Sequence, residues 1–199
     1  MGYLIAAWLA LTSRAAELLE GLEKEGLDVV RLQAARIGFI PEDRKDEGLF
    51  LGLPVSHNIT MALHAGRSAL ALAKPYQREI AELLASLQVK TAGSEAPVAS
   101  LSGGNQQKVL LGRYLAADMD VLLIEEPTRG VDIGAKSEIY KLLRRFTAKG
   151  GAAIVLSRET VELIGLCDRI YVMHANTLVG EMPATEATEH RILDAALVA

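Results

Sequence analysis

The sequence predicts an α/β fold in which a mainly parallel sheet is flanked by helices. From residue 121 onward, short apolar strands alternate with helical segments, the order that builds α/β proteins. Val121 to Ile124 form a continuous apolar run, which is typical of a strand covered on both faces of a parallel sheet. At 199 residues, the chain is long enough for one full domain, or for one core with a small subdomain.

Residues 1–35 are expected to form a helical segment. Apolar residues recur at helical spacing between residues 3 and 25, and Gly26 follows as a helix terminator. The apolar face would either pack against the rest of the protein or touch a membrane surface. Residues 3–11 are too few to span a bilayer, which takes about 20 apolar residues.

The main domain is expected over residues 36–182. A strand at 37–40 leads into a charged loop, and most of 56–92 is helical, with Pro75 opening a helix. A further helix is predicted from about Gly104 to Ala116. The helices between about residues 55 and 117 are expected to form a helical subdomain.

The second half of the chain follows the strand–helix order, and residues 183–199 form a C-terminal helical tail. The expected elements are a strand at 121–124, a helix at 135–148, a strand at 152–156, a short helix at 159–166, and strands at 169–173 and 177–181.

The net charge and the cysteine content exclude some kinds of function. The net charge of −4 provides no basic field for a phosphate backbone, so nucleic acid is not expected as a partner. The single cysteine, Cys167, cannot form an internal disulfide or a thiolate metal site, which fits a reducing cytosol.

Leu101 to Lys108 read Leu-Ser-Gly-Gly-Asn-Gln-Gln-Lys. Ser102, Gly103 and Gly104 stand at the start of a predicted helix, where unpaired backbone N–H groups and the helix dipole favour a phosphate oxygen. Ser-Gly-Gly is also compatible with an ordinary serine N-cap followed by a glycine turn. Both interpretations stay open at this point.

Glu125 and Glu126 follow the buried strand at 121–124. Open α/β sheets bind ligands at the carboxyl ends of their strands, so one carboxylate could orient Mg²⁺ while the other polarises a water. The alternative is a solvated strand end. Consecutive strand residues point to opposite faces, so the two carboxylates cannot share one role.

Together these motifs resemble the ATP-binding cassette (ABC) family. The resemblance is carried by LSGGNQQK at 101–108, LLIEEPTRGVDIGAKSEIY at 122–140, GFIPEDRKDEGLFLGLPVSHNI at 38–59 and DRIYVMHANTLVGEM at 168–182. It is similar in wording and spacing to the C-terminal cassette of ribose-, xylose- or galactoside-type sugar importers. The likeness covers about residues 36–182, and we find none for the segment before it. It implies a partial P-loop NTPase fold of the ABC ATPase type, with a helical signature subdomain.

In that family two cassettes face each other and sandwich ATP, and each gives its signature motif to the ATP held by the other. The resemblance implies that the signature residues touching the triphosphate in trans are Ser102, Gly103, Gly104 and Gln106. It implies Glu126 as the general base or water-positioning carboxylate, Glu125 at the Mg²⁺-supporting position and Asp132 as the aspartate of the loop between cassettes.

The resemblance also implies the cofactors and partners. ATP and Mg²⁺ would be bound together with a second ABC nucleotide-binding domain. Sugar-permease membrane subunits would contact the loop Glu42–Gly48, placing the protein in the cytoplasm, peripheral on the inner face of the cell membrane. ATP binding and hydrolysis would drive carbohydrate uptake.

Three features depart from the family pattern. The 199 residues contain no Gly-Lys dipeptide and hence no G-x-x-x-x-G-K-[ST] loop (Walker A), which normally surrounds the phosphates with backbone amides. Glu125 stands where the family usually has aspartate, and Leu156 to Glu159 contain no switch histidine. We therefore expect the chain alone to be inactive and to bind ATP and Mg²⁺ only with a partner cassette.

Other interpretations of the same motifs remain. The chain could be a non-catalytic interaction module or a nonfunctional truncated remnant of such an ATPase. A chromosome-structure or mismatch-repair ATPase is disfavoured, because the sequence shows neither long heptad arms nor a basic face.

Overall fold

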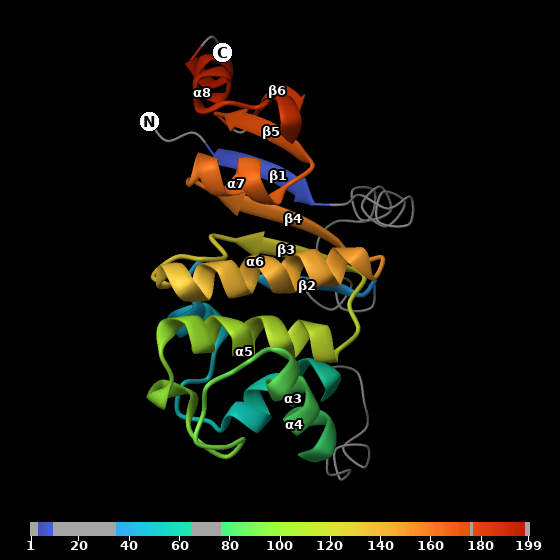
Figure 1. The fold of residues 1–199 in the computed structure, drawn as a ribbon, viewed down its shortest axis with the longest axis vertical. Helices are drawn as coiled ribbons and strands as arrows, with labels where there is room; N and C mark the ends of the chain where they lie inside the picture. Colours follow the sequence, from blue (N-terminus) through green and yellow to red (C-terminus); the bar gives the residue numbers. More distant parts are fainter. Residues whose placement is uncertain (1–3, 10–34, 65–76, 176, 198–199) are drawn as a thin grey trace. The chain divides into compact units, whose positions relative to one another are not determined.

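The computed structural model describes residues 4–9, 35–64, 77–175 and 177–197 (Figure 1). The chain divides into two compact units, each treated by itself below. Unit 1 comprises residues 1–39, 120–127 and 143–199, and unit 2 comprises residues 40–119 and 128–142.

Unit 1 is built on a six-stranded sheet in the order β2-β3-β4-β1-β5-β6 (Figure 1). The strands are β1 (Leu4–Leu9), β2 (Ile37–Ile40), β3 (Val121–Glu125), β4 (Ala152–Ser157), β5 (Arg169–His174) and β6 (Thr177–Pro183). β3 and β4 are parallel, while β1 runs antiparallel to both of its neighbours, so β3, β4 and β5 share one direction. β5 and β6 form an antiparallel pair.

Strand β1 corrects the helix expected at the N-terminus. Leu4–Leu9 pair with β4 on one side and with β5 on the other, so the prediction of a helix over 3–25 is wrong for these six residues. A short apolar run fits a buried helix and a buried strand equally well, and periodicity alone cannot separate them. A place inside the sheet gives the backbone N–H and C=O groups of this run partners on both edges. The rest of the expected helix lies outside the described residues.

The core of unit 1 confirms the strands predicted in the second half of the chain. Val121 of β3 and Ala152 of β4 are buried and pack with Ile37 of β2. Helices α7 (Thr160–Leu166) and α8 (Glu189–Leu197) carry the buried side chains Leu163 and Ile192. The predicted α/β class, with helices flanking the sheet, is therefore confirmed, and β3, β4 and β5 supply its parallel strands. The neighbouring pairs β4–β1, β1–β5 and β5–β6 are antiparallel.

Unit 2 is mainly helical. It contains α3 (Val55–His64), α4 (Gln77–Ser86) and α5 (Gly103–Ala116), together with a one-turn π-helix η1 (Arg44–Gly48) and the first part of α6 (Ile133–Ala148). The helices predicted after Pro75 and from about Gly104 are both present. None of the helices among the described residues is long and apolar enough to cross a membrane.

Helix α5 is buried along most of its length, and its charged side chains are bonded inside unit 2. Arg113 is 8% exposed. Its guanidinium donates to the carbonyl oxygens of Asn58, at 2.8 Å, and Gly48, at 2.7 Å. The Asn58 side chain in turn donates to the carbonyl of Phe50 and accepts from the Phe50 N–H. One buried arginine therefore ties α5 to the segment 48–58.

We predict that Arg113→Met lowers the free energy of unfolding by about 3 kcal/mol, because buried carbonyl oxygens would lose their charged donor. Urea unfolding measures the change. Arg78→Met is the matched control: Arg78 lies on the surface of α4 with its side chain 88% exposed, so removing its ion pair should change little. Equal midpoints for the two variants would contradict the account of Arg113.

A second buried cation joins α5 to α6. Lys108 is 2% exposed, and its ammonium donates to Glu138 of α6 at 2.8 Å and to the Gln88 carbonyl at 2.5 Å. The hydrogen bond from Lys108 lowers the pKa of Glu138 below its ordinary value of 4.5. Folding therefore stabilises the ionised form of the Glu138 side chain relative to its protonated form.

This pair predicts a pH dependence of stability. Because the folded-state pKa of Glu138 is lowered, its contribution is present above the ordinary value of 4.5 and is lost as the pH falls through the folded-state value. The unfolding free energy of the wild type should therefore exceed that of Glu138→Gln at neutral pH, and the gap should narrow in acid. Glu79→Gln, on the exposed face of α4, is the control. If the difference in unfolding free energy between the wild type and Glu138→Gln does not change with pH, the ionised Glu138 side chain does not contribute to stability in this way.

Candidate functional site

The signature helix begins with an exposed serine. Ser102 is the N-cap residue of α5, but its side chain makes no hydrogen bond to the helix backbone. Its Oγ instead accepts a hydrogen bond from the side-chain amide of Asn105 at 2.9 Å. Ser102 is therefore the N-cap of α5 by position, as one of the two interpretations of the motif expected, but its side chain does not cap the helix. Its hydroxyl keeps its own proton for donation to another acceptor.

Gly103 and Gly104 are required by close packing in unit 2. A Cβ on Gly103 would lie 2.6 Å from the Arg44 guanidinium and 2.8 Å from the Gly130 carbonyl oxygen. A Cβ on Gly104 would lie 2.4 Å from the Cβ of Ala135. A Cβ does not approach other non-hydrogen atoms this closely, so only glycine lets the start of α5 lie against the segment 130–135.

Gln106 points inward. Its side chain is 5% exposed and its amide donates to the carbonyls of Val98 and Leu101, at 3.3 and 3.2 Å. The same side chain leaves its Oε1 buried without a hydrogen-bond partner. A contact of Gln106 with a triphosphate would require this side chain to leave the two carbonyls.

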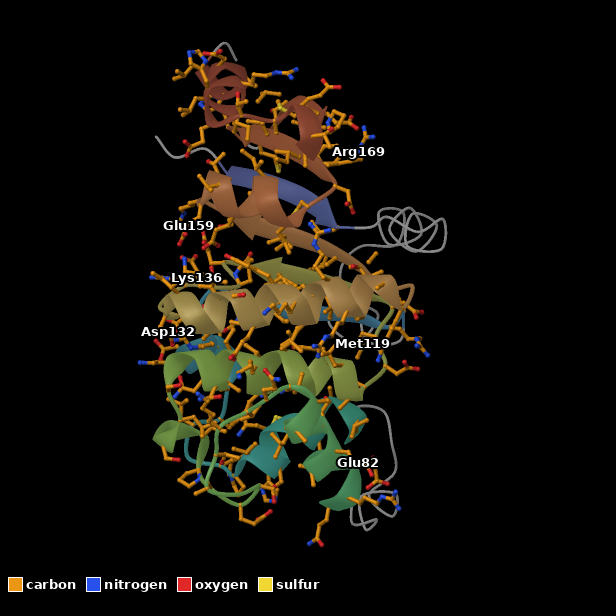
Figure 2. The ribbon with its side chains drawn as sticks, in the orientation of Figure 1. Glu82, Met119, Asp132, Lys136, Glu159 and Arg169 are labelled. Atoms are coloured by element: carbon orange, nitrogen blue, oxygen red, sulfur yellow. The ribbon has the colours of Figure 1, made fainter. Side chains whose placement is uncertain are left out.

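Asp132 is exposed just before α6 (Figure 2). Its Oδ1 accepts from the Ala135 N–H at 2.9 Å, and its carbonyl accepts from the Lys136 N–H at 2.9 Å. Asp132 thus caps the first turn of α6, a role that stabilises a helix start. Its predicted role between cassettes stays a prediction.

In unit 1, Glu125 ends β3 and Glu126 lies beyond the strand. Glu126 has a φ of 44°, in the left-handed region that residues with a side chain seldom adopt. Strand alternation therefore does not decide where its side chain points. The Ser157 hydroxyl donates to Glu126 Oε2 at 3.2 Å, and the Arg158 N–H donates to Oε1 at 3.0 Å. The end of β4 therefore holds both oxygens of this carboxylate.

Sequence reasoning missed three contributors to the candidate site: Ser157, Arg158 and Arg44. Ser157 and Arg158 lie in the segment where the family pattern has a histidine, and nothing else in the sequence draws attention to them. In the structure both donate hydrogen bonds to Glu126. Arg44 is one charge in a loop of charges, yet in unit 2 it donates to the carbonyls of Arg129, at 2.5 Å, and Gly130, at 3.3 Å. These contacts join residues far apart in the chain, and no local pattern marks them.

The glycine packing can be tested by adding one methyl group. Gly104→Ala should lower the unfolding free energy by about 1–3 kcal/mol, because the new carbon would overlap Ala135. Gly165→Ala, in α7, is the control: a Cβ there would have no atom within 4 Å, so the helix should gain about 0.5–1 kcal/mol. Urea unfolding of the two variants should give opposite signs. A stabilised Gly104→Ala would show that the close approach to Ala135 does not exist.

Comparison with known proteins shows which family the chain resembles. A family model described as ABC transporter matches residues 13–129, which begins within the N-terminal segment where sequence reasoning found no likeness. The ribose import ATP-binding protein of Corynebacterium glutamicum is 40% identical over 178 residues, covering 88% of this chain and 34% of that protein. The galactose/methyl galactoside import ATP-binding protein of Photobacterium profundum is 42% identical over 165 residues, covering 81% of this chain and 33% of that protein.

The fold agrees with solved cassettes. A dimeric ATP-binding cassette bound to ADP and inorganic phosphate superposes with a TM-score of 0.63 at 21% identity, covering 79% of this chain and 68% of that one. A cassette of an ABC transporter in its ADP conformation gives 0.67 at 17% identity, covering 87% and 72%. The chain spans about a third of the length of the curated relatives it matches. It has the ABC cassette fold, and the chain belongs to the ABC transporter family.

Proposed function

We propose that this chain provides the signature half of an ATP site in a ribose/galactose-type sugar importer, where ATP binding and hydrolysis drive carbohydrate uptake. The observation that carries the proposal is the exposed Ser102 hydroxyl at the glycine start of α5. The relatives support it, since their names describe ATP-binding proteins for ribose or galactoside import.

The signature would act on ATP held by a partner cassette. The Ser102 hydroxyl and the backbone N–H groups of Gly103 and Gly104 would donate to the triphosphate, aided by the positive end of the α5 dipole. Gln106 would join them only after turning out of its buried position. The 199 residues contain no Gly-Lys dipeptide, so the loop that cradles the phosphates would come from that partner.

Glu126 is the proposed general base or water-positioning carboxylate. In the structure it accepts hydrogen bonds from Ser157 and from the Arg158 N–H, which orient it. Such a carboxylate can hold an attacking water and take its proton. Ser157 and Arg158 would then act through Glu126 as positioning residues.

Among the residues that the structure describes, the side chains do not make a complete magnesium site. The described residues contain no group of three or more His, Cys, Asp or Glu that could hold a metal ion. Glu125 offers one carboxylate, whereas Mg²⁺ takes six ligands and usually keeps several waters and substrate phosphates. We assign Glu125 a supporting position only and derive no step through the metal.

The proposed partners are a second nucleotide-binding domain and sugar-permease membrane subunits. A solved cassette of the same fold is described as dimeric with ADP and phosphate bound. Asp132, exposed at the start of α6, is the proposed contact between cassettes. The loop Glu42–Gly48, with Lys45, Asp46 and Glu47 exposed, is the proposed contact with a membrane subunit at the inner face of the membrane.

A second candidate is a non-catalytic interaction module that keeps the cassette fold. It is favoured by the missing Gly-Lys dipeptide, because the chain's residues do not supply the usual phosphate cradle. The two candidates differ in whether Ser102 affects ATP hydrolysis in a partner.

The first test uses the 199-residue chain alone. Calorimetric titration with Mg-ATP should give no dissociation constant tighter than about 1 mM, because the phosphates would lack their main cradle. A micromolar constant for this chain would overturn the assignment of a half site.

The second test uses the chain mixed with a sugar-importer cassette that has a phosphate loop and a disabled signature. The wild-type chain should restore Mg-ATP hydrolysis, and Ser102→Ala should reduce it at least about tenfold, since a hydrogen bond to a charged oxygen is lost. Ser86→Ala, exposed on α4, is the control. Equal hydrolysis with wild type and Ser102→Ala would favour the non-catalytic module.

A further inference from the structure

We propose that Arg44 is a positioning residue that couples the loop after β2 to the signature motif, so that a displacement of this loop moves the start of α5. This inference rests on the proposed function of the signature. Arg44 lies in the loop Glu42–Gly48, whose contact with a membrane subunit the family likeness implies, but neither the likeness nor the motifs assign Arg44 a contact with the signature. All the contacts that support it lie within unit 2.

Arg44 holds the segment that precedes α6 by its backbone. Its guanidinium donates to the carbonyl oxygens of Arg129 and Gly130, at 2.5 and 3.3 Å. The Arg129 side chain runs the opposite way and donates to Glu42 at 2.6 Å. The segments 42–44 and 129–130 are therefore joined by hydrogen bonds donated from each segment to the other. Since two of these bonds reach backbone carbonyls, Arg44 positions the chain itself and not only a side chain.

The same guanidinium lies against the signature. A Cβ on Gly103 would be 2.6 Å from Arg44 Nη2 and 2.8 Å from the Gly130 carbonyl oxygen. The Arg44 guanidinium and the Gly130 carbonyl oxygen therefore occupy the space that a Cβ on Gly103 would need. Nε of Arg44 is buried without a hydrogen-bond partner, so the guanidinium is held by its Nη atoms and by packing. Close-packed groups of this kind transmit displacement because no space exists to absorb it.

The other end of the π-helix η1 is also attached to α5. A Cβ on Gly48 would lie 2.8 Å from the Leu110 side chain, and the Gly48 carbonyl accepts from the buried Arg113 at 2.7 Å. At its start, η1 is capped by Asp43, whose side chain accepts from the N–H groups of Lys45 and Asp46. The turn thus lies against the start of α5 through Arg44 and against its middle through Gly48.

The exposed side of η1 is the surface at which a partner protein would contact this turn. Lys45, Asp46 and Glu47 are exposed, while Gly48 is buried. A partner that pressed on the exposed charges would move Arg44 with the turn. The Arg129 and Gly130 carbonyls and the start of α5 would then move together, which would change how Ser102 meets a phosphate.

Amide hydrogen exchange in the 199-residue chain tests the coupling without nucleotide. The reporters are the N–H of Gln106, bonded to the Ser102 carbonyl, and the N–H of Val131, bonded to the Thr128 carbonyl. The N–H of Val98, bonded to the Leu53 carbonyl, is the reference within unit 2. Arg44→Ala should speed exchange of both reporters about tenfold and leave the reference unchanged, because charged hydrogen bonds that hold only this region are lost.

Two further variants sharpen the result. Arg78→Ala removes an exposed charge on α4, within the same unit, and should leave both reporters at wild-type rates. Arg44→Lys keeps the charge but not the planar fork, so its reporters should exchange at rates between those of wild type and Arg44→Ala. If Arg44→Ala does not fold, Arg44→Lys carries the test. The coupling is wrong if Arg44→Ala leaves the exchange rate of the Gln106 or Val131 N–H unchanged. It is also wrong if exchange of the Val98 N–H is accelerated to the same extent.

The hydrolysis assay with a partner cassette separates this inference from the proposed function. Arg44→Ala should lower the hydrolysis restored by the chain about tenfold, while Arg78→Ala should not. If the wild-type chain restores no hydrolysis, the proposed function fails, whereas the exchange data still decide whether Arg44 holds the signature. If hydrolysis is restored equally by wild type and Arg44→Ala, the coupling to function is wrong.

Discussion

Within unit 2, the signature part of the candidate site depends on the close approach of two glycines to a neighbouring segment. Gly103 and Gly104 allow the first turn of α5 to lie against Gly130 and Ala135, with the Arg44 guanidinium in the same contact. With no side chain at either position, the backbone N–H groups of the first turn are not covered by side chains of their own residues. Packing and anion recognition therefore make the same demand on these positions, which is the absence of a Cβ atom.

The helix that carries the signature is anchored by buried charges. Lys108 and Arg113 are nearly inaccessible, and each is bonded to carbonyl or carboxylate oxygens of a different part of unit 2. Removing one partner of such a group leaves a buried charge or acceptor unpaired, which costs far more than losing a surface ion pair. We infer that these bonds fix the rotation of α5 about its axis and hence the direction in which Ser102 faces.

Much of the fold could be predicted from the sequence, because β3 and β4 contain continuous apolar runs and the helices carry apolar residues at helical spacing. β1 could not, since Leu4–Leu9 are as compatible with a helix and only the two neighbouring strands decide the outcome. In the site, the signature serine and glycines were found from a local motif. The inward position of Gln106 and the contacts of Arg44 and Ser157 arise from residues distant in sequence, which no motif records.

The central claim is that Ser102 and its two glycines meet the phosphates of an ATP molecule held by another cassette. The most direct measurement is photolabelling with an ATP analogue that carries an aryl azide on its γ-phosphate, using the chain mixed with a partner that has a phosphate loop. The account predicts that mass spectrometry finds the label on the peptide that contains Ser102 to Gln106, and only when the partner is present. Label confined to the partner, or an equal yield on this chain alone, would contradict it.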